Sequence, residues 1–239
     1  MELVETGIIG LDGILGGGLP KGRTILVAGP AGAGKSTFGM QFLYHGIVSG
    51  GESGIFVSFD EHPEHVREET LNFGWNLNDI EKDNLLVIFD GFSPRAGVGS
   101  DEKYQTPVDV DELITQLVEV IDKTSAERVV IDSITALALA MSSEQQIRRQ
   151  ILKLSAVMSS LECTTILTSE MRAGVVSRFG VEEFMSQGVI VLNYEYRNNV
   201  AIRSMNIRKM RGLKHEMSER PFAITPNGIE VFSSEQFYF

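Results

Sequence analysis

The feature that most constrains the fold is a glycine-rich segment, Gly29 to Ser36, which follows the pattern G-x-x-x-x-G-K-[ST]. An apolar run at 24–28 precedes it and a helical pattern at 36–48 follows it, so we expect it to join a buried strand to a helix. Glycines there let successive backbone N–H groups turn inward, and the helix N-terminus adds partial positive charge. The segment therefore predicts a phosphate-binding loop. The alternative, a glycine-rich turn with a chance Lys-Ser pair, does not account for the flanking strand and helix.

The same pattern predicts ATP and Mg²⁺ as the ligands. Lys35 is expected to contact the β- and γ-phosphates, Ser36 to give its hydroxyl to Mg²⁺, and Thr37 to lie near the α-phosphate. The residues predicted to line the nucleotide site are Gly29, Pro30, Ala31, Gly32, Ala33, Gly34, Lys35, Ser36 and Thr37.

Further apolar runs alternate with helical patterns through the first two-thirds of the chain; they lie at 55–59, 85–89, 129–131 and 165–168. This alternation predicts an α/β fold in which helices cover both faces of a mostly parallel sheet. From Gly188 onward the strand-like segments are closely spaced, and we expect antiparallel additions at one edge. The stretch 91–107 is expected to be an exposed loop. No repeat or linker divides the pattern, so we expect one domain over residues 1–239.

Acidic side chains follow two of the predicted strands. Asp132 comes directly after the run at 129–131, where a carboxylate would hold the Mg²⁺ shell; the alternative is an aspartate that only begins a turn. Asp60 and Glu61 follow the run at 55–59, and ligands of open α/β sheets bind at this end of the strands. Glu61 would there orient or deprotonate the attacking water, or both acids would simply favour the start of a helix before Pro63. The pattern alone leaves this second choice open.

The composition limits the classes of partner. The 239 residues include 21 Lys+Arg and 32 Asp+Glu, a net charge of −11 that disfavours binding of nucleic acid by the bulk surface. The single cysteine, Cys163, excludes an intrachain disulfide framework and fits a reducing cytoplasm. No apolar run approaches the roughly 20 residues that span a membrane, and the first residues lack the basic start of a signal peptide. We therefore expect a cytoplasmic protein that binds neither membranes nor nucleic acid.

Short segments along nearly the whole chain match one known family in order and with similar spacing. They are Thr6–Asp12, Gly16–Gly22, Phe38–Tyr44, Phe59–Glu61, Phe73–Trp75, Ser169–Glu170, Gly180–Phe184, Lys209–Gly212 and Pro221–Phe222. In these segments the chain resembles the KaiC domain family of the RecA-like P-loop superfamily, which includes the circadian-clock ATPases. The resemblance implies a RecA-like fold, hydrolysis of ATP, and a hexameric ring with ATP between neighbouring subunits.

The resemblance also implies roles for particular residues. In this family an acid pair after the second strand supplies the catalytic base. Glu61 is the expected base and Asp60 a supporting residue, because the clock proteins typically have Glu at the position of Asp60. The K-x-R-G segment reaches the γ-phosphate of the adjacent subunit, which assigns Lys209 and Arg211 to that contact. His215 matches a position near the same nucleotide.

Basic residues crowd the same region of this acidic chain; they are Arg197, Arg203, Arg208, Lys209, Arg211, Lys214 and Arg220. An arginine supplied across an interface would stabilise charge on the transferring phosphoryl group, whereas the alternative is an edge strand whose charges prevent aggregation. Two differences limit the resemblance: one ATPase domain stands where the clock proteins have two, and 183–186 lacks their adjacent Ser-Thr pair.

The sequence thus predicts a ring-forming, Mg-dependent ATPase that acts on an unknown regulatory protein. The alternatives are a RecA-like ATPase of DNA recombination or repair, and a nucleotide-gated scaffold or autokinase with little turnover.

Overall fold

The computed structural model describes residues 1–107, 109–139, 141–171, 176–197 and 200–232. The strands are β1 Leu3–Val4, β2 Leu19–Pro20, β3 Thr24–Gly29, β4 Ser53–Ser58, β5 Leu86–Asp90, β6 Ala126–Asp132, β7 Thr164–Glu170, β8 Gly188–Arg197, β9 Val200–Met210, β10 Arg220–Thr225 and β11 Gly228–Val231. The helices are α1 Leu11–Leu15, α2 Lys35–Gly50, α3 Pro63–Leu71, α4 Leu77–Lys82, α5 Phe92–Ala96, α6 Val110–Thr124, α7 Ile134–Leu139, α8 Glu144–Ser160 and α9 Glu182–Met185. None of the helices within these ranges is both long and apolar enough to cross a membrane.

Within the described residues, one large sheet has the strand order β11-β10-β9-β8-β3-β7-β6-β4-β5. Neighbouring strands from β8 through β5 run parallel, while β9, β10 and β11 add antiparallel pairs at the other edge. The predicted mostly parallel α/β sheet with antiparallel C-terminal strands is therefore confirmed. The expectation that the antiparallel part begins at Gly188 was wrong by one strand, because β8 pairs in parallel with β3 and reverses only at β9.

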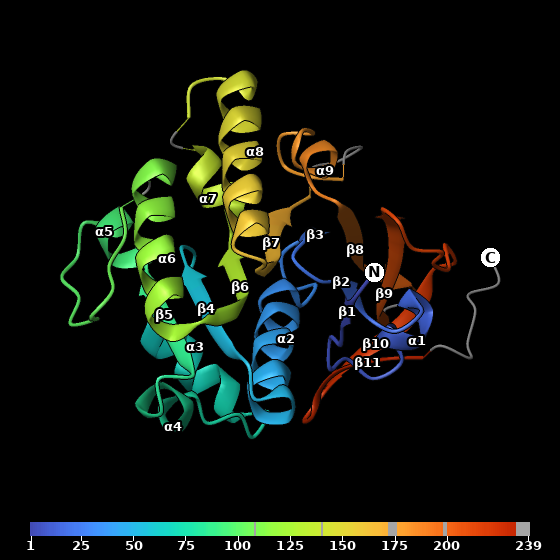
Figure 1. Ribbon diagram of the computed structural model, residues 1–239. Coiled ribbons are helices and arrows are strands. Elements are labelled where there is room, and N and C mark those ends of the chain that lie inside the picture. The colour runs from blue at the N-terminus through green and yellow to red at the C-terminus, as the bar shows by residue number, and fades with distance from the viewer. Residues whose placement is uncertain (108, 140, 172–175, 198–199, 233–239) are drawn as a thin grey trace.

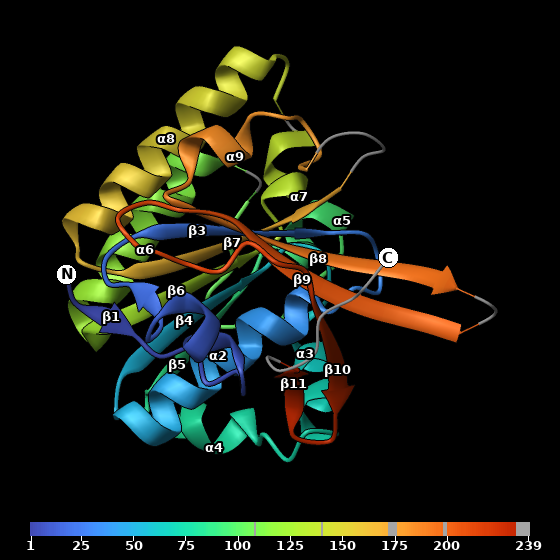
Figure 2. The same ribbon diagram turned by 90° about the vertical axis from the view of Figure 1, so that its right-hand side faces the viewer.

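Helices cover both faces of this sheet, as Figures 1 and 2 show, with α6 and α8 on one side and α2, α3 and α4 on the other. Alternate residues of β3 enter two separate cores: Ile25 and Val27 pack toward α2, and Leu26 and Ala28 pack toward α6 and α8. A strand buried on both faces needs apolar side chains at successive positions, which explains its continuous apolar run. The apolar face of α6 is buried throughout; its residues are Val110, Leu113, Ile114, Leu117 and Ile121.

A buried arginine connects the N-terminal segment and α2 to the central sheet through hydrogen bonds. Arg128 on β6 is 3% exposed and forms an ion pair with Glu52. Its Nη1 donates hydrogen bonds to the carbonyl oxygens of Glu5 at 2.9 Å and Phe42 at 2.8 Å. A buried charge is tolerated only when it is paired and hydrogen-bonded, and Arg128 meets both conditions.

The stretch 91–107, expected to be an exposed loop, is only partly so. The stretch contains the short helix α5, and hydrogen bonds to Asp90, at the end of β5, hold the stretch near both of its ends. The Asp90 carboxylate accepts hydrogen bonds from the Ser93 N–H at 2.9 Å and the Ser100 hydroxyl at 2.5 Å, while the Asp90 carbonyl accepts from the Thr106 N–H at 3.0 Å. Burial opposes ionisation, but these side-chain and backbone hydrogen bonds lower the pKa of Asp90.

Cys163 offers a simple check on the packing beneath α8. It has no exposed surface, its Sγ donates to the Ala126 carbonyl at 3.2 Å, and burial raises the pKa of its thiol to about 11. The thiolate is the reactive form, so we expect the native chain to resist iodoacetamide at about pH 8 and the denatured chain to take one label. Intact-mass measurement distinguishes the two states. Rapid labelling of the native chain would contradict this packing.

Candidate nucleotide-binding site

The glycine-rich segment joins β3 to α2 as predicted, and its shape depends on its glycines. Gly32 and Gly34 have φ values of 76° and 98°, the left-handed region that other residues rarely adopt. A Cβ on Gly29 would lie 2.6 Å from the Leu192 carbonyl oxygen, so the loop approaches β8 too closely for a side chain. The loop therefore has the conformation in which backbone N–H groups can surround an anion at the start of α2.

Lys35 stands at the first position of α2, and its ammonium group folds back over the loop. Its Nζ donates to the Pro30 carbonyl oxygen at 3.0 Å, a neutral acceptor rather than a carboxylate. Burial lowers the pKa of Lys35, and the charges of Asp132, Glu170 and Asp60 oppose this shift in that order. A partly buried cation bonded to a carbonyl, and to no carboxylate among the described residues, is well placed to receive an anionic phosphate.

Asp132 and Ser36, the two predicted Mg²⁺ ligands, are brought together. β6 pairs in parallel with β7, with Ile131 opposite Leu167, so Asp132 at the end of β6 lies beside Thr168. The Thr168 hydroxyl donates to Asp132 Oδ1. Burial raises the pKa of Asp132, and hydrogen bonds from Ser36 and Thr168 act in the opposite direction. One carboxylate and one hydroxyl suit Mg²⁺, which prefers oxygen ligands and usually keeps several waters, so this donor set fits the ion.

The acid pair after β4 lies at the same end of the parallel strands as Asp132, because Ser58 is opposite Asp132 in the pairing of β4 with β6. The two side chains differ in their surroundings. Asp60 forms an ion pair with Arg95 of α5 at 3.2 Å. Glu61 lines a small cavity together with Ser36 and Thr37 of the phosphate loop.

The environment of Glu61 suits a proton acceptor. Burial raises the pKa of Glu61, the nearby charges of Glu69 and Asp132 raise it further, and His65 opposes them. A carboxylate with a raised pKa is a stronger base than an ordinary exposed one. Glu69 lines the same cavity and was not singled out in the sequence, because nothing in the spacing of α3 shows which of its acids turns toward the phosphate loop.

Lys209 and Arg211 lie far from the phosphate loop of their own chain. Met210 and Ile25 both pair with Gly188, so the end of β9 lies level with the beginning of β3, with β8 between the two strands. Gly29 is four residues further along β3, a separation of about 13 Å at the usual rise of a strand. Any contact of Lys209 or Arg211 with a phosphate in this type of site would therefore require a second copy of the chain.

The two basic residues have different surroundings. The Lys209 ammonium donates to the carbonyl oxygens of Glu183 at 2.8 Å and Ser186 at 2.5 Å, so it holds the end of α9. Burial lowers the pKa of Lys209, and the charge of Arg211 adds to this effect. Arg211 is exposed and shares the lining of a hollow of about 390 Å³ with Lys209 and Phe184.

The basic residues that cluster in the sequence between 197 and 220 lie at two different ends of the sheet. Arg203 lies beside the phosphate loop, where its Nη2 donates to the Gly32 carbonyl at 3.2 Å, while Arg208 shares the hollow with Lys209 and Arg211. His215 is half-buried, with Nδ1 3.3 Å from the Leu213 carbonyl oxygen. Arg220 pairs with Glu216, and the side chain of Arg197 lies outside the described residues.

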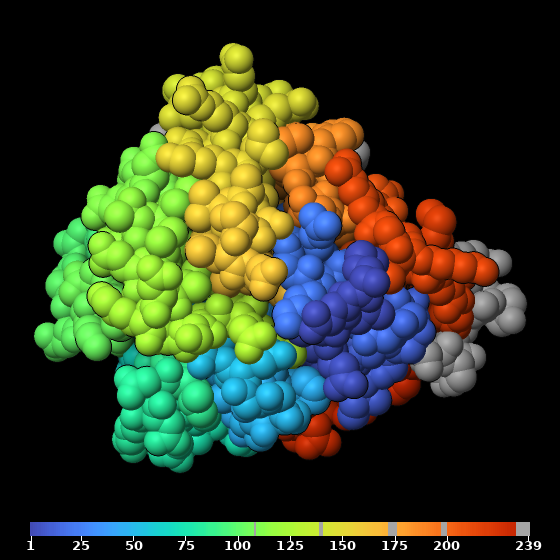
Figure 3. Space-filling view, viewed as in Figure 1, coloured from blue at the N-terminus to red at the C-terminus, as the bar shows by residue number. Residues whose placement is uncertain are grey.

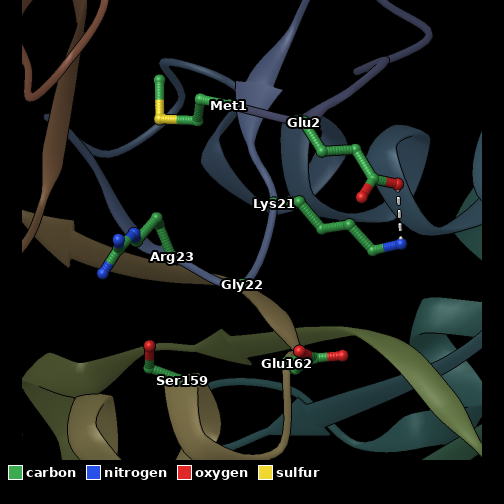
Figure 4. Close-up of a pocket in the computed structure, with 7 residues that line it drawn as sticks. All are labelled: Met1, Glu2, Lys21, Gly22, Arg23, Ser159 and Glu162. Carbon is green, nitrogen blue, oxygen red and sulfur yellow. Dashed lines mark hydrogen bonds and ion pairs between the residues drawn. The ribbon is translucent and has the colours of Figure 1, made fainter.

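A second hollow also lies at the end of the sheet away from the phosphate loop, where β3 and β7 begin. Its lining comprises Met1, Glu2, Lys21, Gly22, Arg23, Ser159 and Glu162. The dark-blue N-terminal residues that border it face the viewer in Figure 3, and Figure 4 shows Lys21 turned toward Glu2. The ion pair between these two side chains is 2.9 Å long. None of the predicted site residues borders this hollow.

Comparison with known proteins shows the family of this chain. The family model described as "ATPase: KaiC" matches residues 4–236. The circadian clock oscillator protein KaiC of Thermosynechococcus vestitus is 40% identical over 234 residues, 97% of this chain and 44% of that protein. The protein of the same name from Acaryochloris marina is 38% identical over 231 residues, 96% of this chain and 44% of that protein. The chain thus spans less than half the length of these relatives.

A solved structure matches along its whole length. The crystal structure of a KaiC-like protein from the hyperthermophilic archaeon Pyrococcus horikoshii OT3 has a TM-score of 0.84 and 38% sequence identity, covering 97% of this chain and 99% of that chain. The family model matches residues 4–236 and the solved structure covers 97% of the chain, so the chain belongs to the KaiC ATPase family.

Proposed function

We propose that this chain, as one ATPase domain over residues 1–239, binds Mg-ATP and hydrolyses it to ADP and phosphate. The observation that carries the proposal is that Lys35 and Ser36 at the start of α2, Asp132 at the end of β6 and Glu61 after β4 gather at one end of the parallel strands. Membership of an ATPase family supports the same reaction. The chain's single cysteine supports a reducing compartment, the cytoplasm.

Each residue has a physical role in this reaction. The backbone N–H groups of residues 31–34 and the Lys35 ammonium bind the phosphates, and Ser36 and Asp132 would hold Mg²⁺, which would neutralise charge on the phosphate oxygens. Thr37 follows Ser36 in α2, near the α-phosphate. Glu61 accepts a hydrogen bond from water, orients its oxygen toward the γ-phosphorus, and takes its proton as the new P–O bond forms and the bond from the γ-phosphorus to the bridging oxygen of ADP breaks.

We further propose that the active form is a homo-oligomer, a hexameric ring, in which Arg211 acts on the nucleotide of a neighbour. The separation of about 13 Å along β3 supports this assignment, because it keeps Arg211 from its own phosphate loop. Lys209 stabilises the region next to Arg211, because it donates hydrogen bonds to the carbonyl oxygens at the end of α9. His215 lies in the same segment of the chain as Arg211. The role of such a ring would be regulatory, through a protein partner of unknown identity.

The proposal is tested by phosphate release from Mg-ATP together with native mass determination. We expect ADP and phosphate in equal amounts, and a mass near six chains when Mg-ATP is present. Salt-dependent binding of DNA that stimulates hydrolysis would favour the recombination alternative instead. A gain of one phosphate in the intact mass without turnover would favour the autokinase.

The trans role of Arg211 has its own test. Arg211→Ala is expected to reduce turnover by at least about tenfold with little loss of ATP affinity, because its guanidinium stabilises charge that develops in the transition state. Mixing Arg211→Ala with Glu61→Gln subunits should restore part of the activity, since some interfaces then combine an intact Glu61 with an intact Arg211. Arg208→Ala, from the same strand region, serves as the control. Rings shown to be mixed but still inactive would contradict the assignment.

A further inference from the structure

The turn that carries Glu61 is held from several sides. The Ser58 hydroxyl donates to the Glu61 carbonyl oxygen at 2.5 Å, and the Phe59 N–H donates to the Asp132 carbonyl at 2.7 Å. The Phe59 side chain is fully buried, and a Cβ on Gly91 would lie 2.3 Å from its ring. These contacts fix the beginning of the turn against β6 and against the start of α5.

Among the side-chain hydrogen bonds of the described residues, only those of Arg95 connect α5 to the segment of the acid pair. Its Nη1 donates to the Phe59 carbonyl at 2.9 Å and to Asp60 Oδ1 at 3.2 Å. One guanidinium thus binds the backbone before Asp60 and the side chain of Asp60 itself. α5 is in turn anchored, because Asp90 accepts from the N–H of the buried Ser93 at 2.9 Å.

Asp60 has an electrostatic reason to need this partner. Asp60 follows the end of β4, where Ser58 lies opposite Asp132, and its charge acts on both Lys35 and Asp132. An unpaired carboxylate there would repel a triphosphate, and a carboxylate paired with a guanidinium does so much less. Both side chains are partly exposed, at 43% for Asp60 and 40% for Arg95, so the ion pair adds little to overall stability and acts chiefly on local geometry.

We propose that Arg95 is a positioning residue for ATP hydrolysis, which holds the Phe59 carbonyl and Asp60 so that Glu61 stays in the cavity beside Ser36 and Thr37. Asp60 is then the partner of Arg95 and not a second base. This assignment rests on the proposed function, since it concerns the geometry of the same water-activating carboxylate. A misplacement of about 1 Å can reduce catalysis by roughly 100-fold, so a pair that contributes little to folding can still be decisive for turnover.

The experiment compares Arg95→Ala, Arg95→Lys, Asp60→Asn and the double variant Arg95→Ala/Asp60→Asn. Turnover is measured by phosphate release, ATP affinity by calorimetry with a non-hydrolysable analogue, and folding by the unfolding midpoint. We expect Arg95→Ala to lower kcat by at least about tenfold, with ATP affinity changed less than about twofold. Arg95→Lys should recover part of the loss, and the double variant should be no worse than Arg95→Ala, because Asp60→Asn can only weaken a contact that Arg95→Ala has already removed.

The matched control is Lys153→Ala, which breaks an exposed ion pair with Asp111 of 2.6 Å on the helices of the opposite face. It should leave kcat and affinity unchanged. An unaltered kcat in folded Arg95→Ala would overturn the assignment, and so would additive losses in the double variant. A loss of ATP affinity with unchanged kcat would place Arg95 on the substrate instead.

Hydrogen–deuterium exchange separates this inference from the proposed function. Arg95→Ala should speed exchange of the amides at 59–62 relative to Lys153→Ala, whether or not ATP is hydrolysed. If the wild-type chain shows no turnover, the proposed function fails and the catalytic role of Arg95 fails with it. If the wild type is active but exchange at 59–62 is unchanged in Arg95→Ala, only the Arg95 assignment fails.

Discussion

Glu61→Gln is expected to reduce hydrolysis by about 10²–10⁴-fold, the usual contribution of a general base. Glutamine keeps the size and the hydrogen-bonding shape of the side chain but cannot accept the proton of water. Binding of ATP and Mg²⁺ should persist, because Lys35, Ser36 and Asp132 are unchanged. Single-turnover phosphate release and equilibrium binding measure the two effects separately.

Asp60→Asn is the matched control for this variant, since it changes the neighbouring acid in the same way. It should cost less, because asparagine can still accept a hydrogen bond from Arg95. Loss of turnover in Asp60→Asn with an intact Glu61→Gln would show that the two roles are reversed. If neither change matters, the acids only begin α3.

The pH profile gives an independent readout of the same carboxylate. Burial raises the pKa of Glu61, and its working form as a base is the deprotonated one. Activity is therefore present above the raised pKa and lost as pH falls through it, so the acidic limb of kcat should lie above that of an ordinary glutamate. Glu61→Gln should abolish this limb.

Lys35→Ala should weaken ATP binding by roughly 10–100-fold, since hydrogen bonds to charged groups contribute about 1.5–3 kcal/mol. The backbone of the loop remains, and the fold should survive because, within the part of the chain that the structure describes, the Nζ bonds only the Pro30 carbonyl. Calorimetric titration with a non-hydrolysable ATP analogue measures the affinity, and circular dichroism checks the fold. Lys21→Ala, at the other end of the sheet, is the control and should bind ATP normally. Wild-type affinity and turnover in folded Lys35→Ala would show that the loop does not bind the nucleotide.

The parts predicted well from sequence are those that local rules determine. The positions of β3, β4, β5, β6 and β7 follow from runs buried on both faces, and the phosphate loop follows from a spacing that only a strand–loop–helix unit satisfies. The direction of β8 could not be predicted in this way, because residue propensities do not distinguish parallel from antiparallel pairing. That choice depends on the path of the chain through α9, which returns it to the beginning of β3.

Which side chains contact one another was the hardest part of the structure to predict from the sequence. The pair of Arg95 with Asp60 joins residues 35 positions apart, and only the placement of α5 beside the end of β4 reveals it. The basic crowding between 197 and 220 was taken as one feature, but pairing of β8 with β9 sends Arg203 and Arg211 to opposite ends of the sheet. Lys209 was predicted as a phosphate contact, and its bonds to the carbonyls of α9 could not be seen from spacing.

Arg211 lies near the beginning of β3, and the phosphate loop follows the end of this strand. The chain therefore has two different ends, one with the arginine and one with the loop. Under the trans assignment each copy offers an arginine from one side and accepts one at the other, so copies must join head to tail. A two-fold dimer, in which like surfaces meet, would complete neither site. An open row of n copies has n − 1 completed sites, whereas a closed set has n, so activity per chain should rise with protein concentration and reach its plateau upon closure.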